Sequence, residues 1–184
     1  MSDEKELKDA RHNFWYGVAN GALFRCGFSF FSVDVIIPSY ISDMANRVNW
    51  MISTSVIVSF ATVAQRLGWK LPQFLIANHL EVRQEKLPVY GAAAFSRVVT
   101  LILLALSVFF VGEGNLNLLL GLSLLFISLF GLFGGVSGAA YMDIVGKAIP
   151  ADQRGKYYRN RNVIGGILVF AFSGPLISFI QEST

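Results

Sequence analysis

One stretch of the chain, Leu116–Met142, carries no charged residue at all. A helix of that length in a soluble protein needs a polar face toward water, and this stretch offers none. Burying its whole surface inside a protein of 184 residues is implausible. A bilayer core about 30 Å thick, by contrast, accepts an apolar helix of about 20 residues. The stretch therefore predicts a membrane-spanning helix.

Four further apolar runs approach the same length, and the composition agrees with them. Hydrophobic residues make up 54% of the chain and charged residues 15%, whereas about 25% of the residues in a soluble domain are charged. The predicted spans are Phe14–Ile37, Trp50–Ala77, Val89–Val111, Leu116–Tyr141 and Val163–Ile180. Barrel strands would show segments of about ten residues with alternating polarity, and the sequence has no such pattern. We therefore expect an all-α membrane protein with five transmembrane helices.

The basic residues are distributed unevenly among the expected loops. They are concentrated in the N-terminal tail, the second loop and the fourth loop: Lys5, Lys8, Arg11, Arg83, Lys86, Lys147, Arg154, Lys156, Arg159 and Arg161. The first and third loops offer only Arg47, beside Asp43 and Glu113. Because cytoplasmic loops carry an excess of Lys and Arg, we expect the N-terminus and the second and fourth loops on the cytoplasmic side of a cell membrane.

The two ends of the chain and its single cysteine add further expectations. The first dozen residues mix both charges and lead into the first span without a cleavage signal, so we expect that span to remain as an anchor. Five spans that begin inside would leave Gln181–Thr184 outside, which predicts an incomplete chain with one domain, residues 1–184. Cys26 lies inside the first span and predicts no disulfide. The net charge of +3 reflects the loops and does not indicate nucleic acid as a partner.

The sequence carries no enzyme or metal signature. It contains no His-Glu-x-x-His, no P-loop and no Gly-x-Ser-x-Gly, and its two histidines, His12 and His79, are expected near the cytoplasmic surface. We therefore expect no enzymatic activity, no cofactor and no bound metal.

The fourth span contains two overlapping G-x-x-x-G patterns, Gly131 with Gly135 and Gly134 with Gly138. Small residues at this spacing let a second helix approach closely. One interpretation is simple close packing, and the other is a smooth interface that moves. Both predict a helix bundle.

The second span carries a polar stripe. Its members follow one another at spacings of four, three, four, four and three residues: Ser55, Ser59, Thr62, Arg66, Lys70 and Gln73. These spacings place them on one helix face. A charge at mid-bilayer costs about 2.5–3.5 kcal/mol even on the lenient scale, so the stripe should face protein or water. We favour the wall of a substrate cavity; the alternative is that Arg66 and Lys70 are neutralised by carboxylates or carbonyls and serve assembly.

The first span adds two candidates for the same cavity, Asn20 and Arg25. Arg25 falls near the middle of its span among apolar neighbours, whereas Asn20 also suits a hydrogen bond between helices. Arg97, in the third span, is close enough to the cytoplasmic end to snorkel and is left out of the site.

The stretch Gly131–Gly155 resembles the major facilitator superfamily of transporters. Its glycine-rich helix end leads into Asp143 and then Ile149-Pro150-Ala151-Asp152-Gln153-Arg154-Gly155, which is similar to the family's loop between helices four and five. The second loop matches the family's signature in outline, with Ala77, Glu81 and Lys86 at its glycine, aspartate and last basic position. The resemblance implies a six-helix half-bundle, of which this chain would supply helices one to five, and a second half that completes the transporter. The arginine that drug–proton antiporters of the family carry in helix four has no counterpart here.

The resemblance also implies a cytoplasmic gate formed by Glu81, Arg154, Lys86 and Asp143. Glu81 is expected to approach Arg154, or failing that Lys86 or Lys147, and so to tie the second loop to the fourth. The other interpretation is that these are solvated loop charges held inside by the insertion rule alone.

The expected function is transport of a small solute by alternating access, with an anionic solute favoured by the two cations of the stripe. The expected partners are membrane lipid, the solute and the second six-helix half. The alternative is a membrane interaction or assembly protein that does not transport, or a truncated transporter fragment.

Overall fold

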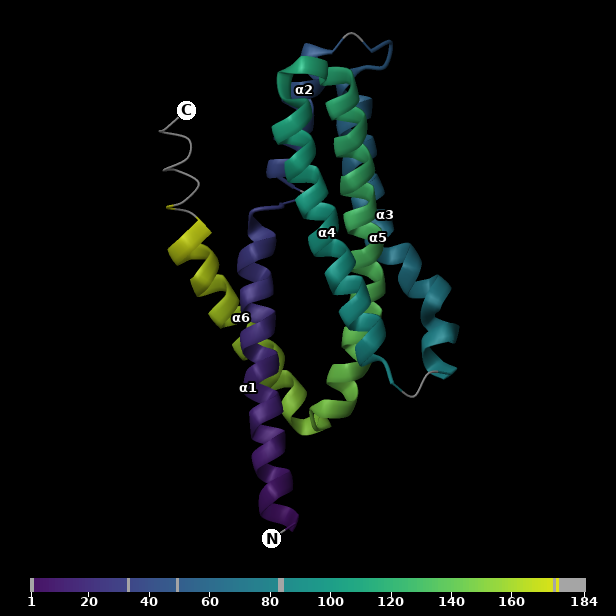
Figure 1. Ribbon diagram of the computed structural model, residues 1–184. Coiled ribbons are helices and arrows are strands. Elements are labelled where there is room, and N and C mark those ends of the chain that lie inside the picture. The colour runs from purple at the N-terminus through teal and green to yellow at the C-terminus, as the bar shows by residue number, and fades with distance from the viewer. Residues whose placement is uncertain (1, 33, 49, 83–84, 174, 176–184) are drawn as a thin grey trace. The chain divides into compact units, whose positions relative to one another are not determined.

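The computed structural model describes residues 2–32, 34–48, 50–82, 85–173 and 175, and within these it consists of helices without any strand (Figure 1). The side chains of residues 2–10, 77–82, 113 and 173 lie outside this description. The all-helical prediction is confirmed for the described residues. The chain divides into two compact units, residues 1–32 with 145–184 and residues 33–144, which are described separately.

The first unit is built on α1 (Ser2–Ser29) and α6 (Arg154–Leu168). The ring of Phe14 meets that of Tyr157 edge-on at 5.6 Å, and Arg25 further along α1 bonds to Asn162 further along α6. The two helices therefore run parallel, although they come from opposite ends of the sequence. Gly17 makes room for the aromatic contact, because a Cβ there would lie 2.7 Å from the Tyr157 hydroxyl.

Short helical turns flank α6 in this unit. The 3₁₀ turn Ala151–Gln153 precedes it and the π-helical turn Val169–Ser173 continues from it. Pro150 stands just before the 3₁₀ turn, where its lack of an N–H costs no helical hydrogen bond.

The second unit contains α2 (Ile36–Arg47), α3 (Thr54–Val82), α4 (Leu87–Val111) and most of α5 (Leu116–Ala148), with the 3₁₀ turn Gly112–Asn115 joining the last two. Its core is apolar, and Ile37, Ile41, Leu120 and Ile127 are almost completely buried. The hydroxyl groups of Tyr40 and Ser123 lie 3.2 Å apart and connect α2 to α5. The guanidinium of Arg97 in α4 lies 4.4 Å from the Phe130 ring centre of α5 and 5.3 Å from that of Trp69 in α3.

The first predicted span requires a correction, because Phe14–Ile37 is not one helix. Helix α1 ends at Ser29, and α2 begins at Ile36 within what was expected to be the end of the span and the following loop. Pro38 disfavours a continuous helix at the start of α2, because there it would remove the hydrogen bond to the carbonyl of Asp34 and clash with it. As the third residue of α2, Pro38 needs no helical partner for its nitrogen.

The other helices agree with the predicted spans in order and differ from them at their ends. Helices α3, α4 and α5 contain most of the second, third and fourth spans, and α5 continues to Ala148. Helix α6 starts nine residues before Val163 and ends at Leu168, while the predicted residues 176–180 lie outside the described residues. Figure 1 shows α3 bent in its later part, where Pro72 cannot donate a hydrogen bond to the turn before it.

Two of the described helices, α4 and α5, are long and apolar enough to cross a membrane. Only 11% of the most apolar stretch of α4 and 33% of that of α5 are buried inside the structure. A core helix of a soluble protein would be covered by its neighbours, whereas α4 has most of its apolar residues exposed and α5 exposes a smaller set, which includes Leu118, Leu125 and Leu132. This exposure suits a lipid environment.

Candidate functional site

The exposed side of α3 consists of two parallel stripes. The polar stripe has Ser55, Ser59, Arg66 and Lys70 exposed, with Thr62 and Gln73 half-buried. Each of these six residues is followed directly in the sequence by an exposed apolar residue, and together these form the apolar stripe: Val56, Phe60, Val63, Leu67, Leu71 and Phe74. The remaining side of the helix, which includes Ile57, Ala61 and Gln65, is buried in the unit. Helix α3 therefore presents three different faces, one buried, one polar and one apolar.

Arg66 of the polar stripe forms an ion pair with Asp34, which lies just before α2. Both side chains remain well exposed, at 63% for Arg66 and 72% for Asp34. The pairing leaves the group of Arg66, Lys70 and Asp34 with one net positive charge. The sequence therefore identified Arg66 and its helix face but not its partner Asp34. For Arg66, the structure shows the neutralisation by a carboxylate that was the alternative to an unpaired cation in the cavity wall.

Two members of the predicted cavity wall have their polar groups turned to protein. The Thr62 hydroxyl donates to the Val58 carbonyl oxygen at 3.0 Å, within its own helix. The amide nitrogen of Gln73 lies 3.3 Å from where a Cβ of Gly138 would stand, so this side chain packs against α5. Of the predicted wall on α3, Arg66 and Lys70 are the exposed charged members, and Ser55 and Ser59 are exposed as well.

The two candidates from the first span belong to the other unit. Arg25 donates from Nη1 to the side-chain oxygen of Asn162 at 3.2 Å and to its carbonyl oxygen at 3.4 Å. Asn20 lies on the exposed side of α1. The prediction that these two residues share a cavity with the α3 stripe stays a prediction.

The predicted gate residues fall into two separate contacts. Lys86 Nζ lies 2.8 Å from Asp143 Oδ1, and this pair ties the start of α4 to the late part of α5. Arg154 donates from Nε to the Ile149 carbonyl at 3.1 Å and from Nη2 to the Gly146 carbonyl at 2.5 Å. It therefore satisfies carbonyls at the end of α5 that have no partner within the helix. The Glu81 side chain lies outside the described residues, so its contact with Arg154 stays a prediction.

The four glycines of the fourth span lie where α5 meets α3. A Cβ at Gly131 would stand 2.6 Å from the Gln65 carbonyl oxygen, and one at Gly135 would stand 2.6 Å from the carbonyl oxygens of Gly68 and Trp69. At Gly134 a Cβ would meet the Trp69 ring at 2.5 Å. The backbones approach so closely that no side chain fits between them.

A second glycine pair of the same kind was missed in the sequence. Gly17 and Gly21 form a G-x-x-x-G pattern on α1, and the side chains of Tyr157 and Arg161 of α6 lie against them. The signal was present in the sequence, but the partner helix comes from the far end of the chain.

Among the described residues no group of three or more His, Cys, Asp and Glu is placed to hold a metal ion.

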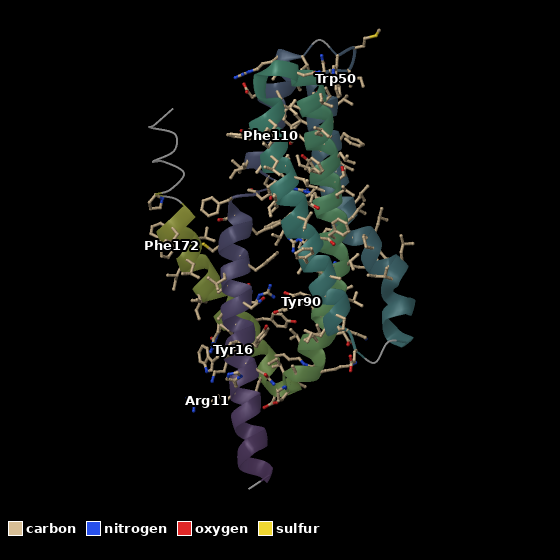
Figure 2. The ribbon with its side chains drawn as sticks, viewed as in Figure 1. Arg11, Tyr16, Trp50, Tyr90, Phe110 and Phe172 are labelled. Carbon is tan, nitrogen blue, oxygen red and sulfur yellow. The ribbon has the colours of Figure 1, made fainter. Side chains whose placement is uncertain are left out.

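Figure 2 shows the labelled residues Tyr90 and Phe110 near opposite ends of α4. They are 20 residues apart, which corresponds to about 30 Å along a helix and to the thickness of a bilayer core.

Comparisons with protein-family models, with curated proteins and with solved structures find no match to this chain.

Proposed function

We propose that this chain is the membrane-embedded N-terminal half of a secondary transporter, in which the polar stripe of α3 lines the path of a small solute. The observation that carries the proposal is the division of the exposed side of α3 into a polar and an apolar stripe. Lipid suits the apolar stripe, and charged side chains at that depth require water or protein instead. The resemblance of Gly131–Gly155 to the major facilitator superfamily adds the alternating-access mechanism and a second six-helix half.

The charges of the stripe favour a solute with at most one negative charge. Arg66 is balanced by Asp34, so within the part of the chain that the structure describes Lys70 supplies the cation without a carboxylate partner. A fixed cation in a wall of low dielectric attracts an anionic solute strongly, and two uncompensated cations would attract the anion more strongly than one. We therefore extend the proposal to monoanionic solutes and regard neutral solutes as the next class to test.

A second candidate is a membrane protein that assembles with partners without transporting a solute. The Arg66–Asp34 ion pair favours it, because an arginine neutralised within the chain is free to serve structure alone. This function predicts that loss of the pair changes the amount of folded protein and leaves solute flux at background.

Transport by the product of the complete reading frame, reconstituted in vesicles, tests both candidates. A panel of monoanionic and neutral solutes is assayed for uptake and efflux with the wild type, Arg66→Gln, Lys70→Gln and the matched control Arg47→Gln. Arg47 is a suitable control, because it pairs with Asp43 one turn away on α2. Transport reduced in the first two variants at normal protein levels supports the solute path. Flux at background for the wild type with every solute, or equal protein loss in both stripe variants, supports assembly instead.

A further inference from the structure

The exposed face of α6 changes from cationic to apolar along its length. Lys156, Arg159, Val163 and Ile167 follow at spacings of three, four and four residues, which places them on one helix face. Both cations are exposed, as are Val163 at 55% and Ile167 at 60%. Phe170 continues this face in the π-helical turn and is 85% exposed.

Helix α1 carries exposed aromatic side chains at the height along the helix pair where the cations of α6 lie. The contact between the rings of Phe14 and Tyr157 fixes the register of α1 against α6. Trp15 and Tyr16, directly beside this contact, are 48% and 67% exposed, and Arg11 lies one turn earlier (Figure 2). Exposed Trp and Tyr next to basic residues are typical of the interface between lipid and water. The cations of α6 therefore lie at the same level as exposed aromatic side chains of α1, and beyond this level the exposed face of α6 is apolar.

From this coincidence we infer that Lys156 and Arg159 bind the phosphate of an acidic phospholipid in the cytoplasmic leaflet, with its acyl chain along Val163 and Ile167. A lipid presents an anionic headgroup and an apolar chain in the same order as this face of α6 presents cations and apolar residues. A soluble phosphate or a nucleic acid would use only the cations. The inference rests on the membrane placement in the proposed function and is independent of transport.

The experiment measures which lipid lies beside α6. Cys26 is the single cysteine, so a Cys26→Ser, Val163→Cys protein accepts one fluorophore on the inferred face. The labelled full chain is reconstituted into vesicles of phosphatidylcholine with brominated phosphatidylglycerol, or with brominated phosphatidylcholine at the same fraction. Quenching by the two brominated lipids gives their relative affinity at this position. The same measurement is made on Lys156→Gln/Arg159→Gln and on the matched control Arg47→Gln.

We expect phosphatidylglycerol to be preferred about fivefold or more, since each surface cation contributes about a factor of five. The preference should fall to about one in the double variant and should persist in Arg47→Gln. Equal quenching by both lipids in the wild type, or an undiminished preference in the double variant, would overturn the headgroup site while leaving the membrane placement intact. Absence of quenching by either lipid would overturn the membrane placement as well.

Discussion

Lys86 and Asp143 form an ion pair of 2.8 Å in which the lysine side chain is only 8% exposed and the aspartate side chain 34% exposed. A buried ammonium without its carboxylate is costly, whereas a carboxylate with some exposure is hydrated more easily. We expect Asp143→Asn to lower the free energy of unfolding by about 2–3 kcal/mol, somewhat less than for a fully buried pair. Denaturation in detergent, followed by circular dichroism, measures this change.

The double variant Lys86→Met/Asp143→Leu is the control for this ion pair. It should cost less than Asp143→Asn alone, because an apolar pair leaves no buried charge. A double variant as unstable as the sum of the two single variants would show that the residues act independently.

The second prediction concerns the contact of α3 with α5. Gly131→Ala and Gly135→Ala each place a methyl group within 2.6 Å of a backbone carbonyl oxygen, so the helices must move apart. We expect each substitution to cost about 1–3 kcal/mol of stability. Gly121→Ala on the same helix is the matched control, because a Cβ there meets nothing within 4 Å. The control should be neutral or stabilising by up to about 1 kcal/mol, and equal losses at all three positions would refute the packing role.

The third prediction concerns the contact of α1 with α6. A methyl group at Gly17 would stand 2.7 Å from the hydroxyl of Tyr157, whose side chain is 1% exposed and has little room to move. We expect Gly17→Ala to destabilise the protein by about 1–3 kcal/mol. Gly27→Ala, in open space on the same helix, should not destabilise it. Thermal unfolding of the two variants side by side decides the matter, and matching melting temperatures would count against the contact.

The fourth prediction concerns membrane orientation. Ser53 is an exposed position between α2 and α3, and Gln153 is an exposed position in the fourth predicted loop. In a Cys26→Ser background, Ser53→Cys should react with a membrane-impermeant thiol reagent in intact cells, and Gln153→Cys only after the membrane is opened. The opposite order would invert the topology, and reaction of both in intact cells would place both loops outside.

Local patterns in the sequence predicted much of the helical order. The charge-free run from Leu116 predicted α5, and the glycine spacing from Gly131 to Gly138 identified the strip that packs against α3. These features follow from short-range periodicity, which a single sequence displays directly. The same periodicity placed Arg66 and Lys70 on one face of α3.

Features that depend on partners distant in the chain were not predictable. Asp34 pairs with Arg66, which is 32 residues further along the chain, and Gly17 packs against Tyr157 of α6. The break between α1 and α2 was not predicted either, because most residues of the run Phe14–Ile37 are hydrophobic despite Arg25 and Asp34. The restriction imposed by Pro38 outweighed that hydrophobic signal.

The pairing of Phe14 with Tyr157 has a consequence for how the protein is made. The two residues are 143 positions apart, and ribosomes add about 5–20 residues per second, so α1 waits about 7–30 s for its partner helix. During that interval the whole of the second unit is synthesised, and Gly17 and Gly21 stay without the side chains of Tyr157 and Arg161 that later pack against them. Contacts of such long sequence separation close late in folding. Helix α1 is therefore made long before it can reach its native packing against α6, and its apolar side chains that face α6 stay uncovered by this partner until then.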